Sequence, residues 1–173
     1  MNAVRTVSLP MPLRDSPAYS PWGDAMRHLT RVLIGRLGGP PSHRAFMAML
    51  NAFRASGGTA REGDLARCLE DCGAHFRLPE LLASGTAFGF EWRHSLWIPM
   101  FQFDLHDLHD LSVKPGPQQV LAELGTEFDG WKLATWFAQL SCWLNGRRPV
   151  DLVDSNLPAV LHAARLDRFI ELG

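Results

Sequence analysis

The densest group of potential metal ligands lies in one short polar stretch. Five ligand-type residues fall within residues 104–110: Asp104, His106, Asp107, His109 and Asp110. Carboxylates and neutral imidazoles bind divalent metals, and two histidines three residues apart share one face of a helix. This stretch follows a predicted strand, however, and leucine recurs at every third position as an apolar anchor. We therefore expect a solvated connector here and no metal site.

A second metal-like pattern is Cys68-x3-Cys72 followed by His75, which resembles half of a zinc site. The other half is missing, because Cys142 is the only further cysteine in the chain. Cys68 and Cys72 also fall on the apolar stripe of a predicted helix. The sequence thus predicts buried, reduced thiols and no redox chemistry.

Motifs for covalent catalysis and phosphate binding are absent from the sequence. There is no Gly-x-Ser-x-Gly elbow, and Gly57-Gly58 lacks the Gly-Lys-Thr ending of a phosphate-binding loop. We therefore expect a protein that is not an enzyme and that needs no cofactor.

An aromatic row in the middle of the chain could stack on nucleic-acid bases. It consists of Trp92, Trp97, Phe101 and Phe103. Stacking platforms need interleaved basic residues, and only Arg93 is adjacent. A packed core is the favoured interpretation.

Composition places the chain among ordinary globular proteins: 173 residues, 46% hydrophobic and 20% charged, with a net charge of -1. No run of about 18 apolar residues predicts a membrane span, and prolines interrupt the first residues where a signal peptide would lie. We therefore expect a cytoplasmic protein with no membrane partner. The charge is asymmetric, at +5 for residues 1–60 (7 Arg, 2 acids) and -6 for residues 61–173 (10 basic, 16 acidic).

The first half of the sequence predicts short helices. Residues 1–21 form a proline-punctuated flexible arm, and residues 22–85 an N-terminal helical region. In that region we expect helices over 24–37, from Ser42 to Gly57-Gly58, from Thr59 through a capping box with Glu62, and over 79–83. This succession is compatible with a degenerate helix-turn-helix.

Aromatic residues that alternate with small or charged ones then predict a β-hairpin over residues 86–104, with a three-residue loop at Arg93-His94-Ser95. Because Pro99 has no N–H to donate, its strand is expected at an edge or at a bulge. A lone hairpin is marginal in water, so its aromatic face must pack on helices.

Residues 105–173 predict a C-terminal helical domain. Helices are expected over 118–124, over 130–144 behind an Asp129 cap, from Pro149 to Val153, and behind a Ser155 or Asn156 cap. Leu133, Phe137, Leu140 and Leu144 would share one face of the second helix. The fold class is therefore mainly α: a small helical bundle with one β-hairpin between an N-terminal helical part and a C-terminal helical domain.

Two blocks of the second half resemble a known family. Trp131-x4-Trp136-Phe137, Trp143-Leu144-Asn145-Gly146-Arg147-Arg148-Pro149-Val150-Asp151-Leu152 and Ala163-Ala164 are similar to the C-terminal toxin-binding domain of Xre/MbcA/ParS-type antitoxins. Ile98-Pro99-Met100-Phe101-Gln102-Phe103-Asp104 resembles the strand that often precedes that domain. One departure is that Leu140-Ser141 stands where relatives have Pro-Asn, which predicts an unbroken helix there.

The resemblance implies an antitoxin of a bacterial toxin-antitoxin system, binding and neutralising a RES-domain toxin, which degrades NAD. Family members often form homodimers and can bind operator DNA through an N-terminal helix-turn-helix. The matching partner-binding positions are at the turn and the C-terminal tail: Arg147, Arg148, Asp151, Arg165, Arg168, Phe169 and Ile170. Deleting residues 165–173 is expected to abolish neutralisation and leave the fold intact. The alternative is a DNA-binding transcriptional regulator without a toxin partner.

Overall fold

A computed structural model describes residues 41–71, 78–104 and 112–173 of the protein. The expected arm over 1–21, the helix over 24–37, and Cys72, His75, His106, Asp107, His109 and Asp110 lie outside these residues. The described part is mainly α with a small amount of β structure, as predicted.

The first helix, α2 (His43–Phe53), begins and ends as its sequence predicts. The Ser42 side chain caps it by accepting from the Ala45 N–H. Its inward face buries Phe46, Met49 and Phe53, and a short 3-10 turn, η1 (Arg54–Ser56), leads to Gly57 and Gly58. These glycines have φ values of 97° and 75°, which residues with a Cβ rarely adopt.

The predicted helix start at Thr59 is wrong. Residues Thr59–Arg61 form strand β1, and helix α3 (Glu62–Asp71) begins only at Glu62. Thr59 lies opposite Pro99 in the sheet, so pairing with a distant strand overrides the local capping signal. Within α3, Leu65 and Leu69 are buried and Cys68 is exposed, which corrects the prediction of a buried thiol at Cys68.

The hairpin is part of a three-stranded antiparallel sheet in the order β1-β3-β2, formed by β1, β2 (Phe90–Trp92) and β3 (Ser95–Pro99). Its turn has two residues, because Trp92 pairs with Ser95 and both Arg93 and His94 have positive φ. The predicted three-residue loop is therefore wrong. Pro99 lies in the central strand, and it is tolerated because the strand ends there; the next N–H, of Met100, donates to Gly58 O at 2.9 Å.

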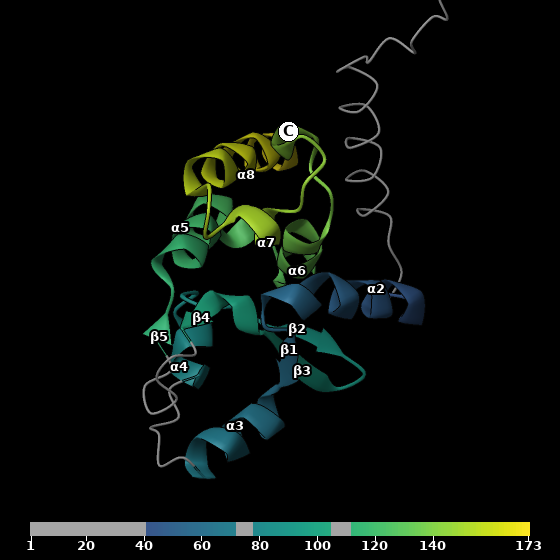
Figure 1. The fold of residues 1–173 in the computed structure, drawn as a ribbon, viewed down its shortest axis with the longest axis vertical. Helices are drawn as coiled ribbons and strands as arrows, with labels where there is room; N and C mark the ends of the chain where they lie inside the picture. The colour runs from purple at the N-terminus through teal and green to yellow at the C-terminus, as the bar shows by residue number, and fades with distance from the viewer. Residues whose placement is uncertain (1–40, 72–77, 105–111) are drawn as a thin grey trace, which may run out of the picture.

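The remaining elements lie on either side of this sheet. Helix α4 (Leu78–Ala83) precedes the hairpin, as predicted for 79–83, and the 3-10 turn η2 (Met100–Gln102) follows it. Strands β4 (Phe103–Asp104) and β5 (Ser112–Val113) pair antiparallel. Figure 1 shows α3 and α4 at one end of the molecule and the C-terminal helices at the other.

The C-terminal helices are α5 (Pro115–Leu124), η3 (Gly125–Glu127), α6 (Gly130–Ala138), η4 (Cys142–Leu144), α7 (Pro149–Leu152) and α8 (Leu157–Leu172). The predicted Asp129 cap is confirmed, since its side chain accepts from the Lys132 N–H at 2.8 Å. Asn156, one of the two predicted caps, begins α8. Helix α5 starts three residues before its predicted start because prolines are accommodated in a first helical turn.

The predicted continuous helix over 130–144 is wrong. Helix α6 ends at Ala138, and the backbone of Gln139 is extended. Ser141 then donates its N–H to Arg147 O at 3.0 Å, forming an isolated bridge. Leu140, expected on the buried stripe, is 53% exposed, whereas Leu133, Phe137 and Leu144 are buried as predicted.

Two apolar clusters hold the described residues together. The larger joins α2 and the hairpin to α5, α6, α7 and α8, so the first described helix packs on the C-terminal helices. The smaller lies around Leu65, Leu69, Leu78, Ile98 and Phe103. The helix–sheet junction is tight, because a Cβ on Gly130 would collide with the backbone oxygen of Gly89.

Candidate functional site

Helix α8 carries four of the seven predicted partner-binding residues, and its buried face fixes its position. Val160, Ala163, Ala164 and Asp167 face the core. The two alanines have small side chains, which lets α8 pack closely on α5, its main neighbour. The opposite face of α8 is therefore the one presented to solvent.

Asp167 is the centre of this attachment and is only 5% exposed. Its Oδ2 accepts a hydrogen bond from Trp136 Nε1 at 2.8 Å, and its Oδ1 accepts one from Trp143 Nε1 at 2.9 Å. Trp136 comes from α6 and Trp143 from η4, so one carboxylate connects three elements. Both bonds are charge-assisted when the carboxylate is ionised, which makes them stronger than bonds between neutral groups.

Three further contacts hold the end of α8. Lys132 Nζ on α6 lies 3.0 Å from Glu171 Oε1. Arg165 Nε lies 3.0 Å from Glu123 Oε2, and Arg168 Nη1 donates to Glu123 O at 3.2 Å. The Arg168 guanidinium also packs against Gly125, where α5 ends. Arg165 and Arg168 thus both contact the C-terminal end of α5 within the same chain.

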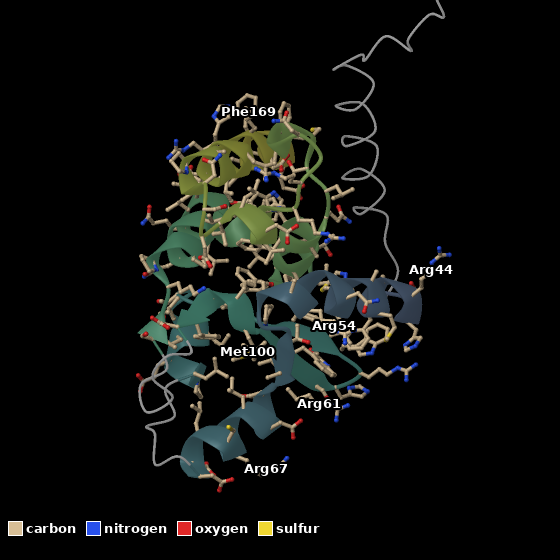
Figure 2. The ribbon with its side chains drawn as sticks, viewed as in Figure 1. Arg44, Arg54, Arg61, Arg67, Met100 and Phe169 are labelled. Atoms are coloured by element: carbon tan, nitrogen blue, oxygen red, sulfur yellow. The ribbon has the colours of Figure 1, made fainter. Side chains whose placement is uncertain are left out.

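The outer face of α8 is apolar where it ends. Phe169 is 78% exposed and Leu172 is 61% exposed, and Figure 2 shows the Phe169 side chain directed away from the rest of the molecule. Ile170 is half-buried. Phe169 therefore does not fold back onto the core, although Arg168 beside it does contact its own chain.

The second predicted region is the turn that joins η4 to α7. Asn145 and Gly146 have positive φ values of 55° and 74°, which reverse the chain between Ser141 and Arg147. Arg147 is exposed, and Arg148 Nη1 lies 3.9 Å from Asp151 Oδ2, one helical turn later. Such exposed pairs contribute little to stability, so these side chains can reorient toward a partner.

Hydrophobic side chains exposed near these two regions extend the candidate surface. Among the residues that the structure describes, four of the five exposed large hydrophobic side chains lie within residues 140–172: Leu140, Trp143, Phe169 and Leu172. Trp143 is 37% exposed even though its indole N–H is bound to Asp167. We name the set of Trp143, Phe169, Leu172, Arg147 and Arg148 the C-terminal surface.

Asp167 was missed by sequence reasoning. Its neighbours in the tail stand out by charge or aromatic character, whereas an acid in a helix normally indicates a solvated face. The available signal was the position of Asp167 on the same helical face as Val160 and Ala164. A buried acid there can accept hydrogen bonds from the indole N–H groups of the tryptophans.

The aromatic row of the sequence is a packed core, as predicted. Phe101 and Phe103 are buried, and Trp92 and Trp97 pack against the larger cluster. Among the described residues, no group of three or more His, Cys, Asp or Glu side chains could hold a metal ion. An apolar groove of about 480 Å³ lies between the hairpin and α5 to α6, bounded in part by Phe88, Leu121 and Leu133.

No protein-family model, curated protein or solved structure matches this chain. Within residues 41–71, 78–104 and 112–173, every helix is too short or too polar to cross a membrane.

Proposed function

We propose that the protein is an antitoxin that binds and neutralises a RES-domain, NAD-degrading toxin through its C-terminal surface. The observation that carries this proposal is the exposed Phe169 on a helix that is otherwise firmly attached. Protein interfaces concentrate their binding free energy in a few aromatic and arginine side chains surrounded by less critical contacts. A fixed helix that presents Phe169 and Leu172 to solvent has the form of such an anchor.

The attachment of α8 supports the proposal because the helix is already ordered before a partner binds. A tail that becomes ordered only on binding loses conformational entropy, which reduces affinity. Here the hydrogen bonds to Asp167 and the contacts to Glu123 hold the helix in place before any partner arrives. The Phe169 side chain is therefore presented from a rigid base.

The contacts that hold α8 make deletion of the tail an unsuitable test. Deleting residues 165–173 removes Asp167, Arg168 and Glu171, which all bind other elements, so the fold is not expected to remain intact. A single exposed side chain is the cleaner target.

Replacing Phe169 with alanine is expected to weaken toxin binding about 30-fold, equivalent to the ~2 kcal/mol of an interface hot spot. The melting temperature should not change, because the side chain is 78% exposed. The measurement is affinity for the toxin encoded beside this gene, together with cellular NAD in cells that co-express both proteins.

Met47→Ala is the matched control, since Met47 is 42% exposed on α2, away from the C-terminal surface. It should neutralise like the unmodified protein. Equal neutralisation by Phe169→Ala and Met47→Ala would contradict the proposed surface. A neighbouring gene product that neither stops growth nor co-purifies with this protein would contradict the function itself.

A further inference from the structure

The apolar end of α8 consists of two exposed side chains, Phe169 and Leu172. They are three residues apart, so they lie on one face of the helix. The contact of 3.0 Å between Lys132 Nζ and Glu171 Oε1 fixes this end of α8 beside the first turn of α6. The two apolar side chains are therefore held next to the start of α6.

Aromatic contacts connect the start of α6 to the start of α2. Trp131, the neighbour of Lys132 in α6, stacks on the Trp92 ring at 6.0 Å between ring centres. The Trp92 ring also contacts His43, the first residue of α2, at 6.5 Å. Residues 1–40, which precede α2, thus join the described part of the molecule a few side-chain contacts away from the apolar end of α8.

The sequence just before α2 supplies an apolar stripe of matching character. Residues 24–37 have the pattern of an amphipathic helix. The side chains on its apolar stripe are Met26, Leu29, Val32, Leu33 and Leu37. A stripe of this kind has to be buried against another apolar surface.

The chain between this stripe and α2 is long enough to let the stripe reach α8. The linker is Gly38-Gly39-Pro40-Pro41, and four residues span at most about 13 Å. A helix over residues 24–37 adds about 21 Å. A compact domain of the size described here is about 35 Å across, so the segment reaches the apolar end of α8 without unfolding α2.

The charges of the two regions are complementary. Residues 24–37 contain three arginines and one acidic residue. At the end of α8, Lys132 is surrounded by acidic residues: it pairs with Glu171, contacts the backbone oxygen of Glu127 at 3.5 Å, and donates its N–H to Asp129. The side chains of Glu127 and Asp129 are exposed, and the two arginines of α8 contact α5 instead. A basic segment is favoured beside such an acidic rim.

We propose that residues 24–37 form a helix whose apolar stripe packs on Phe169 and Leu172 of the same chain and covers them while no partner is bound. This contact does not depend on what the partner is. Its consequence for the toxin rests on the proposed function: the toxin must displace the helix, so its apparent affinity is reduced by the fraction of molecules in which the helix is packed.

The test is amide hydrogen exchange of the full chain without toxin. A helix of about 14 residues is marginal in water by itself, so the amides of residues 24–37 are protected only if the helix is packed. Leu33→Asp should lower their protection roughly 10- to 100-fold, the factor that corresponds to burying one large apolar side chain. The double variant Phe169→Ala with Leu172→Ala should lower it by at least as much.

Two control variants match these changes. His28→Asp introduces the same charge off the apolar stripe, and Met47→Ala removes an exposed apolar side chain from α2. Both should keep the protection of residues 24–37. The amides of α5 and α6 should exchange alike in all variants, which verifies that the core stays folded.

Unprotected amides over residues 24–37 in the unmodified chain would overturn the proposal. Protection that survives the Phe169→Ala, Leu172→Ala double variant would overturn it as well, because the helix would then pack elsewhere. So would protection that weakens on dilution, since that result indicates contact with a second copy. Leu33→Asp should also bind the toxin more tightly; unchanged toxin affinity together with lost protection would overturn the competition alone.

Discussion

Replacing Asp167 with alanine is expected to destabilise the protein by about 3–5 kcal/mol. Two indole N–H groups would lose their acceptor, and each hydrogen bond to a charged group is worth roughly 1.5–3 kcal/mol. Trp136 is buried, so its N–H would have no ready access to water. The free energy of unfolding, measured by urea titration, tests this expectation.

Asp167→Asn separates the two bonds, because an amide keeps only one acceptor oxygen for two donors. It should lose about half as much as the alanine variant. Asp154→Ala is the control: Asp154 pairs with Lys114 at 2.8 Å, but its side chain is 63% exposed, so the loss should stay below about 1 kcal/mol. Similar values for Asp167→Ala and Asp154→Ala would show that the indole contacts contribute little.

Loss of the Asp167 hydrogen bonds should also weaken toxin binding, because the positions of Trp143 and Phe169 both depend on the position of α8. Trp143 is held by Asp167 Oδ1, and Phe169 lies two residues further along the same helix. Asp167 is thus a positioning residue in the proposal. Toxin affinity should fall in Asp167→Asn at temperatures at which the variant is still folded.

The features that were predicted correctly depend on residues close together in the chain. Ser42, Asp129 and Asn156 cap their helices by accepting from an N–H three residues later. The stop at Gly57, just after α2 and η1, and the short α7 that begins at Pro149 are equally local, because backbone preference alone favours them. Such signals can be read from a few letters of sequence.

Two of the wrong predictions, the helix start at Thr59 and the continuous helix over 130–144, depend on contacts formed further along the chain. Thr59 with Glu62 has a valid capping pattern, but β1 gains more by pairing with β3, about forty residues later. The end of α6 at Ala138 is stabilised by the Ser141–Arg147 bridge and allows Trp143 to reach Asp167. Neither contact leaves a local pattern, so the stripe of leucines favoured a longer helix.

The same distinction applies to the C-terminal surface. The exposed arginines at 147 and 148 could be selected from the sequence, because they lie in a Gly-Arg-Arg-Pro turn. The contribution of Trp143 to this surface could not, since its indole N–H is held by Asp167, 24 residues later in the chain.

Replacing Gln102 with alanine is expected to cost about 3–5 kcal/mol, because its fully buried side chain makes three hydrogen bonds. Its Oε1 accepts from the Phe88 N–H at 2.9 Å, and its Nε2 donates to Phe88 O at 2.7 Å and Pro99 O at 2.9 Å. The side chain thereby joins the segment before β2 to the end of β3. Urea titration measures the loss, with the exposed Gln118→Ala in α5 as control.

Gln102→Glu tests whether the two donated bonds matter, since glutamate has almost the same shape. An ionised carboxylate would face two carbonyl oxygens, and burial raises a carboxyl pKa in the folded state above its unfolded value of about 4.3. A raised folded pKa makes the variant most stable at low pH and progressively less stable as the pH rises above about 4.3. The deficit relative to the unmodified protein should therefore be larger at pH 8 than at pH 5; a deficit that is small and independent of pH would mean that Gln102 acts only by filling space.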